Sequence, residues 1–228
     1  MQHYSTDRRL ILVLLLLSAV SVGFFVATGI VYRSFGYWYL VWNLFLAWVP
    51  LGFVALLSVV LRRQRWSGWL GTLLTLLWLV FLPNSFYLVS DFIHLGDIGK
   101  LDVLSSAIMF LLFALTGLLL GFVSLFYIHQ QLLKRISTRA SHSIAGFVLL
   151  LCSFAIYLGR DLRWNSWDAI LHPAAILFDV SDPFIHPAAH RDAFSTTLMF
   201  LVLLGSLYIA IWQLTKAIRT SSVVQKAG

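Results

Sequence analysis

The chain has 228 residues, of which 60% are apolar and 11% are charged. Soluble domains usually contain about 45–50% apolar residues, and the mean hydropathy of this chain is +0.89. This composition excludes an ordinary soluble globule, a disordered chain and a coiled-coil rod, and it predicts a multi-pass membrane protein. The formal net charge of +7 comes without a nucleic-acid-binding motif. We therefore expect the lipid bilayer, and no nucleic acid, as the partner.

Six apolar runs have the length of membrane-spanning helices, which need about 20 residues each. They predict an all-α helical transmembrane bundle that forms a single integral membrane domain over residues 1–228. The stretch between the last two runs, residues 174–193, is too polar to span and is expected to form an interfacial or re-entrant surface loop. The predicted spans are residues 10–32, 39–61, 69–89, 103–128, 144–159 and 194–218.

Charged residues are distributed unevenly between the two sides of this predicted bundle. The two termini and the second and fourth connections hold 11 of the 16 Lys and Arg residues, and the alternate loops hold 5. Cytoplasmic loops are enriched in Lys and Arg, so we expect both termini in the cytoplasm. The loops 90–102 and 160–193 then face away from the cytoplasm. They contain eight of the nine acidic residues, all of which are Asp, and four of the seven His.

The end of the third span carries polar residues at helical spacing. A helix that stopped at Leu82 would be only about 21 Å long, so we expect it to continue past Pro83 with a kink. Such a polar stripe is expected to face the bundle interior or a water-filled recess. On a continuous helix the stripe occupies an arc of about 80° and consists of Asn84, Tyr87, Asp91 and His94.

The end of the fifth span is compatible with two local structures. On a continuous helix, a second polar stripe falls within an arc of about 60°. In the alternative, the helix breaks near Asn165 or Ser166, and one of these caps a short interfacial helix with Asp168 in its first turn. The break would separate Asp161 from the rest of the stripe. That stripe consists of Asp161, Asn165, Asp168 and His172.

Two motifs resemble those of a known family. They are LPNxxYxxxDxxHL over residues 82–95 and YLGRxxRWNSWD over residues 157–168. Both are similar to motifs of bacterial integral membrane proteins that are grouped as a domain of unknown function, and the similarity covers roughly residues 25–215. The resemblance implies a multi-pass protein of the bacterial inner (plasma) membrane. It implies no reaction, substrate or cofactor.

The two stripes together predict a polar pocket at the extracytoplasmic ends of spans three and five. The residues leave the biochemical function of this pocket open. One alternative is a membrane-embedded enzyme with Asp91, His94 and Asp168 as its catalytic residues, because a sheltered carboxylate–imidazole pair can transfer protons. Such a membrane-embedded enzyme would act on an envelope lipid or a cell-wall precursor. The remaining pocket residues, with binding or structural roles, are expected to be Asn84, Tyr87, Arg160, Arg163 and Asn165.

The sequence leaves the cofactor open, and a divalent metal ion is one candidate. Asp91 with His94 and Asp168 with His172 have i,i+3 and i,i+4 spacing. Two such pairs facing each other would supply four ligands of the types that Zn and Mn accept. Metal-assisted chemistry is therefore an alternative to acid–base catalysis by the side chains alone.

Two further functions are compatible with the same residues. A small transporter would use polar groups within the spans. An accessory or scaffold subunit would need only structural ion pairs, such as Arg160 or Arg163 with Asp91 or Asp168. Gly117 and Gly121 form a small-xxx-small pair in the fourth span. Such pairs allow close helix contact, so these glycines are a candidate interface for a homo-oligomer or a membrane partner.

Overall fold

The fold is known from a computed structural model, which describes residues 2–96 and 102–227. Helices form the secondary structure of this part of the chain, and it contains no strand. Six helical segments are long and apolar enough to cross a membrane, which confirms the predicted all-α bundle. These candidate spans are Arg8–Tyr32, Tyr39–Val60, Trp69–Leu95, Val103–Leu133, Thr138–Asp161 and Arg191–Ile218.

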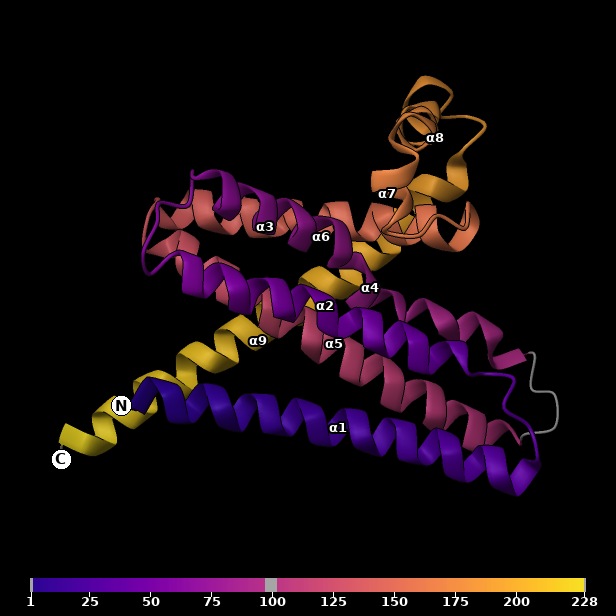
Figure 1. The fold of residues 1–228 in the computed structure, drawn as a ribbon, viewed down its shortest axis with the longest axis horizontal. Helices are drawn as coiled ribbons and strands as arrows, with labels where there is room; N and C mark the ends of the chain where they lie inside the picture. The colour runs from indigo at the N-terminus through magenta and orange to yellow at the C-terminus, as the bar shows by residue number, and fades with distance from the viewer. Residues whose placement is uncertain (1, 97–101, 228) are drawn as a thin grey trace.

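The short helix α4 lies at the centre of the contacts that matter for the site. It packs against α2, α5 and α6, while α1 packs on α5 and α9 packs on α6. Figure 1 shows the axes of α1, α2 and α5 roughly aligned, with α1 antiparallel to the other two and α9 crossing them at an angle. The helices are α1 (Gln2–Tyr32), α2 (Tyr39–Val60), α3 (Trp69–Phe81), α4 (Pro83–Tyr87), η1 (Ser90–Gly96), α5 (Val103–Leu133), α6 (Thr138–Asp161), α7 (Asp168–Leu171), α8 (Pro173–Ile185) and α9 (Arg191–Ala227).

The third span is divided where the sequence predicts a kink. Helix α3 ends at Phe81, and Pro83 occupies the first turn of α4. Proline has no N–H group and a fixed φ angle, so it is tolerated at the start of a helix better than inside one. The Ser85 N–H group donates to the Leu82 carbonyl at 3.1 Å instead of continuing the α-helical ladder. The kink is therefore a break between two helices, and the 3-10 helix η1 follows.

The expectation of a loop over residues 174–193 is wrong for its first half, because helix α8 forms there. Pro173 starts this helix, in the position that proline favours. With 13 residues, α8 is about 20 Å long, which is too short to cross a hydrocarbon core of about 30 Å. In Figure 1, α7 and α8 stand out from one end of the bundle.

Candidate functional site

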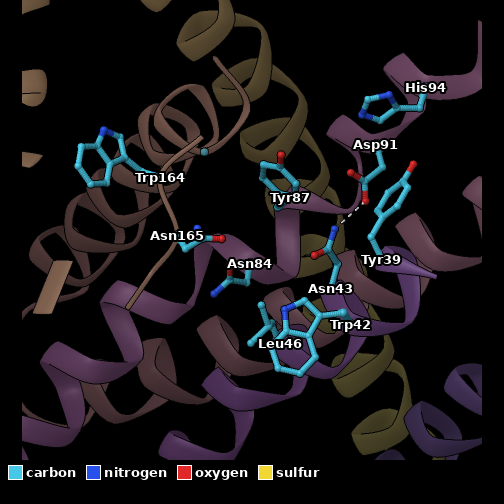
Figure 2. Close-up of a pocket in the computed structure, with 11 residues that line it drawn as sticks. Tyr39, Trp42, Asn43, Leu46, Asn84, Tyr87, Asp91, His94, Trp164 and Asn165 are labelled. Carbon is cyan, nitrogen blue, oxygen red and sulfur yellow. Dashed lines mark hydrogen bonds between the residues drawn. The ribbon is translucent and has the colours of Figure 1, made fainter. Parts of the chain in front are cut away.

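A pocket of about 240 Å³ opens near one end of the bundle, between α2, the α4–η1 segment and the chain that follows α6. Its wall is rich in amide and aromatic side chains, and it contains one carboxyl group and one imidazole (Figure 2). The lining residues are Tyr39, Trp42, Asn43, Leu46, Asn84, Tyr87, Asp91, His94, Gly159, Trp164 and Asn165.

The polar stripe predicted at the end of the third span lines this pocket with all of its members. The backbone that carries the stripe is not the continuous helix that the sequence predicts. Asn84 and Tyr87 belong to α4, whereas Asp91 and His94 belong to the 3-10 helix η1. The spacing of 3, 4 and 3 residues therefore places four side chains on one wall even though the helix type changes along it.

Asp91 is the most buried ionisable group of the wall, with only 3% of its surface exposed. The Asn43 side-chain amide donates to its Oδ2 at 3.2 Å. The His94 imidazole is near enough to interact with it electrostatically, and the His94 ring lies 5.9 Å from that of Tyr39. Within residues 2–96 and 102–227, no Lys or Arg side chain forms an ion pair with Asp91. The Asp91 carboxyl group is therefore hydrogen-bonded by the neutral Asn43 amide, and it can also interact with a ligand that enters the pocket.

Asn43 is a site residue that sequence reasoning missed. It is the sole Asn of α2 and lies in an otherwise apolar span. Its side chain meets Asp91 across 48 residues of sequence. A single amide in an apolar span was the available signal, since polar side chains inside a membrane tend to have polar partners.

Asn84 has a structural role that follows from the break at Pro83. Its side-chain amide donates to the Phe81 carbonyl at 3.1 Å and to the Ser166 hydroxyl at 2.8 Å. Ser166 in turn donates to the Val80 carbonyl at 3.0 Å. These side chains replace backbone partners that the helix break removes, as a bilayer requires. They also attach the loop after α6 to the third span.

The continuous-helix alternative for the end of the fifth span is wrong. Helix α6 ends at Asp161, and Arg163 has a positive φ of 60°, which reverses the chain direction. The Trp164 N–H group then donates back to the Leu158 carbonyl at 3.1 Å. The helix breaks and Asp168 lies in the first turn of a short helix, as the second alternative predicts. The break follows Asp161 rather than lying near Asn165 or Ser166, and Trp167 precedes α7 as its cap residue.

Gly159 allows the end of α6 to approach the pocket. A Cβ atom at this position would lie 3.1 Å from the Tyr87 ring and 3.4 Å from the Trp164 carbonyl oxygen. The missing side chain therefore leaves room for Tyr87 on one side and for the returning loop on the other. That loop brings Trp164 and Asn165 to the pocket wall.

Asp168 lies outside the pocket lining, contrary to its predicted catalytic position. Its Oδ2 accepts hydrogen bonds from the Asn165 backbone N–H at 2.8 Å and from the Asn165 amide at 3.3 Å. The carboxylate thus closes the local turn at the start of α7. His172 is exposed at the end of that helix. The reversal at Arg163 explains why Asn165 is the member of the second stripe that lines the pocket, whereas Asp161, Asp168 and His172 do not.

The predicted four-ligand metal set is not assembled. In the part of the chain that the structure describes, no group of three or more His, Cys or Asp residues is placed to hold a metal ion. Asp91 and His94 remain together on the pocket wall, while Asp168 and His172 lie apart from it. The two pairs therefore do not face each other as the metal hypothesis requires.

The two arginines also differ from their predicted positions. Arg160 pairs with the neighbouring Asp161 at 3.2 Å and donates to the Thr196 hydroxyl at 3.3 Å. Arg163 is exposed and does not line the pocket. The ion pairs expected with Asp91 or Asp168 are absent among the described residues. The pocket wall is therefore less cationic than the sequence motifs suggested.

The close helix contact predicted at Gly117 and Gly121 occurs inside the chain. Cβ atoms at these positions would lie 2.5 Å from the Ser85 carbonyl oxygen and 2.6 Å from the Phe86 ring, respectively. Both glycines therefore pack against α4. This contact occupies the surface that we considered for a homo-oligomer or a membrane partner, so these two residues do not provide such an interface.

A second polar cluster connects α8 to the start of α9. The Asp182 carboxylate pairs with His186 at 2.9 Å and with His190 at 2.7 Å. The hydrogen bond with the His186 side chain is the main cause that lowers the pKa of Asp182, with a further contribution from His190. A different contact connects α8 to the pocket, because the Trp164 indole N–H donates to Asp179 at 2.7 Å.

The six candidate spans and the polar pocket define a multi-pass membrane protein with a solvent-accessible site at one end of its bundle. A family model described as a protein of unknown function, DUF1361, matches residues 42–211. The chain belongs to this family, which confirms the membership in an uncharacterised family that the two motifs predict. No curated protein and no solved structure matches the chain.

Proposed function

We propose that this protein binds the polar head group of an amphiphile in its pocket, and that Asp91 and His94 exchange protons with the bound group. The burial of the Asp91 carboxyl on the pocket wall, without a Lys or Arg partner among the described residues, carries this proposal. A buried carboxyl group destabilises a fold unless it is paired. Ionisable groups inside membrane proteins are usually kept for function.

The proposal includes a location for the pocket. The excess of Lys and Arg in alternate connections, 11 against 5, favours cytoplasmic termini and a pocket on the opposite side. The family motifs favour a bacterial inner membrane. An amphiphile of the outer leaflet, such as an envelope lipid or a lipid-linked precursor, would then reach the pocket directly.

An amphiphile fits the pocket better than a purely water-soluble ligand because one wall continues onto the lipid-facing surface. Trp42 lines the pocket and is also 45% exposed. Its ring stacks on that of Phe45, which is 58% exposed, with 5.4 Å between the ring centroids. A ligand with its head at Asp91 can therefore extend an apolar tail along these two rings into the bilayer.

The acid–base role follows from the different surroundings of the two groups. Asp91 is buried and faces the ligand, whereas His94 is exposed and in electrostatic contact with Asp91. A proton taken from the ligand by Asp91 can pass through His94 to water, and the reverse path returns it. This path supports our proposal that the protein is a membrane-embedded enzyme whose reaction proceeds by proton transfer.

The binding step is tested with the protein in nanodiscs and three eight-carbon amphiphiles: octylammonium, octyl β-glucoside and octyl phosphate. Calorimetric titration, with empty nanodiscs subtracted, should detect saturable binding of at least one of them. Trp42→Ala should weaken this binding at least tenfold, whereas Trp69→Ala should not. Trp69 is a suitable control because it is 76% exposed and lies outside the pocket. Absence of saturable binding for all three amphiphiles would overturn the proposal.

The proton-transfer step has its own measurement. If Asp91 changes protonation when the head group binds, the observed enthalpy of binding will depend on the ionisation enthalpy of the buffer. This dependence should vanish in Asp91→Asn and persist in Asp161→Asn, whose carboxylate is exposed and paired with Arg160. A buffer-independent enthalpy in the wild type would contradict an acid–base role for Asp91.

A further inference from the structure

We infer that the head group recognised by this pocket is a protonated primary amine, rather than a phosphate or a sugar. This inference rests on the proposed function and specifies its ligand. It derives from the polarity of the groups that line the wall. The 11 lining residues include one carboxyl group and three amides, and none of them is Lys or Arg.

The three asparagines present hydrogen-bond acceptors to the pocket. The amide NH₂ group of Asn43 donates to Asp91, that of Asn84 to Phe81 and Ser166, and that of Asn165 to Asp168. A backbone carbonyl or a carboxylate can only accept, so these partners fix which end of each amide is the nitrogen. All three side-chain carbonyl oxygens therefore remain available as acceptors for a ligand, and Asn43 and Asn165 each keep one further N–H.

Figure 2 shows how these acceptors are arranged. The oxygens of Asn43 and Asn165 are turned toward the space between the two residues, with Asn84 below it. The Asp91 carboxyl lies beside this space, between the rings of Tyr87 and Tyr39 in this view. A ligand that enters it meets amide oxygens and a carboxyl group, so a group with several N–H donors satisfies the wall best.

The aromatic side chains favour a cation for a separate reason. Trp42, Trp164, Tyr39 and Tyr87 all line the pocket. The faces of such rings attract cations, and aromatic cages are a known way to bind ammonium groups. An anionic head group would instead face the buried Asp91 without a lining Lys or Arg to compensate its charge.

The nearest arginines do not change this balance. Arg160 is engaged by Asp161 and Thr196, and Arg163 is exposed outside the lining. Sites for phosphate usually direct arginine forks or lysines at the ligand. Here Arg160 is close enough to Tyr87 to interact with it electrostatically, but its charge is balanced by Asp161, which acts on the same residue.

The test compares head groups on one eight-carbon tail in the nanodisc titration. We expect octylammonium to bind at least tenfold more tightly than octyl β-glucoside and octyl phosphate. Octyltrimethylammonium has the charge but no N–H donor, so it should bind more weakly than octylammonium. Equal affinity for these two cations would refute the role of the amide acceptors. Ethanolamine provides the tail-free arm: affinity within threefold of octylammonium would identify a free amine as the ligand rather than a lipid head group.

Two variants connect the preference to the named residues. Asp91→Asn should reduce octylammonium affinity at least tenfold, while Asp161→Asn should leave it unchanged. Asn165→Ala removes an acceptor at an exposed loop position, keeps the backbone bond to Asp168, and should reduce affinity several-fold even if Asp91→Asn fails to fold. If octyl β-glucoside or octyl phosphate binds most tightly and still depends on Trp42, the amine inference is wrong and the proposed function stands. If no amphiphile binds, both are wrong.

Discussion

Replacing Gly117 by Ala tests the contact that holds α4, and with it one wall of the pocket, against α5. The new Cβ atom would lie 2.5 Å from the Ser85 carbonyl oxygen. A backbone oxygen cannot rotate away, so α4 must shift as a unit, and overpacking of this kind costs about 1–3 kcal/mol. Alanine also favours a helix by up to about 1 kcal/mol relative to glycine. The steric cost must therefore be measured against a glycine that has space around it.

Gly146→Ala is that reference, because a Cβ atom at Gly146 would have no neighbour within 4 Å. We expect Gly117→Ala to be less stable than Gly146→Ala by about 1–3 kcal/mol. Gly121→Ala should also be less stable than Gly146→Ala, since its Cβ would meet the fully buried Phe86 ring at 2.6 Å. Reversible unfolding in mixed micelles of increasing SDS content gives the free energies. Equal stability of the Gly117 and Gly146 variants would refute the assigned α4–α5 contact.

Three further predictions follow from individual contacts. Ser166→Ala removes the hydroxyl between Asn84 and the Val80 carbonyl, so unfolding in the same assay should be easier by about 1 kcal/mol; an unchanged free energy would exclude this loop attachment. Hydrogen bonds from Ser105 and Tyr32 lower the pKa of Asp102 to about 2. The stabilisation that this carboxylate provides is therefore complete above its unfolded-state pKa of about 4 and is lost as the pH falls through about 2. The stability difference between wild type and Asp102→Asn should accordingly be constant from pH 7 to about 5 and decrease at lower pH; a difference that disappears near pH 6 would contradict it. A reporter that is active only in the cytoplasm, fused after Gly228, should be active, and a silent fusion would mean reversed orientation or an odd number of spans.

The spans were predictable because their signal is local. An apolar run of sufficient length must form a helix in a bilayer, since its backbone groups have no other partners there. All six predicted runs overlap the candidate spans of the structure. The helix α8 was missed because its sequence mixes Asp and Ser with apolar residues and contains Pro183 in its interior. These features are typical of loops, and they outweighed the helix-starting proline at its first position.

Only one part of the site could be predicted from the sequence. It is the segment from Asn84 to His94, where residue spacing determines which side chains share a face. The stripe from Asn84 to His94 lines one pocket although its backbone changes from α4 to η1. Residue spacing could not predict contacts between segments that are distant in the sequence. Neither the amide of Asn43 on Asp91 nor the reversal at Arg163, which separates Asp168 from the pocket, leaves a periodic trace in the sequence. Each of these two features depends on a single residue: Asn43, whose hydrogen-bond partner is distant in the sequence, and Arg163, whose backbone has a positive φ.

The polar residues in and beside the pocket therefore have two kinds of role. Asn84 and Ser166 supply hydrogen bonds to carbonyl groups beside the break at Pro83, which the bilayer would otherwise leave unpaired. Any side chain that places a hydrogen-bond donor near these carbonyl groups could take over this role. Asp91 is different, because it completes no backbone bond and its burial disfavours the fold. A structural role explains Asn84 and Ser166, whereas for Asp91 we propose a ligand that brings positive charge and N–H donors to its carboxyl group.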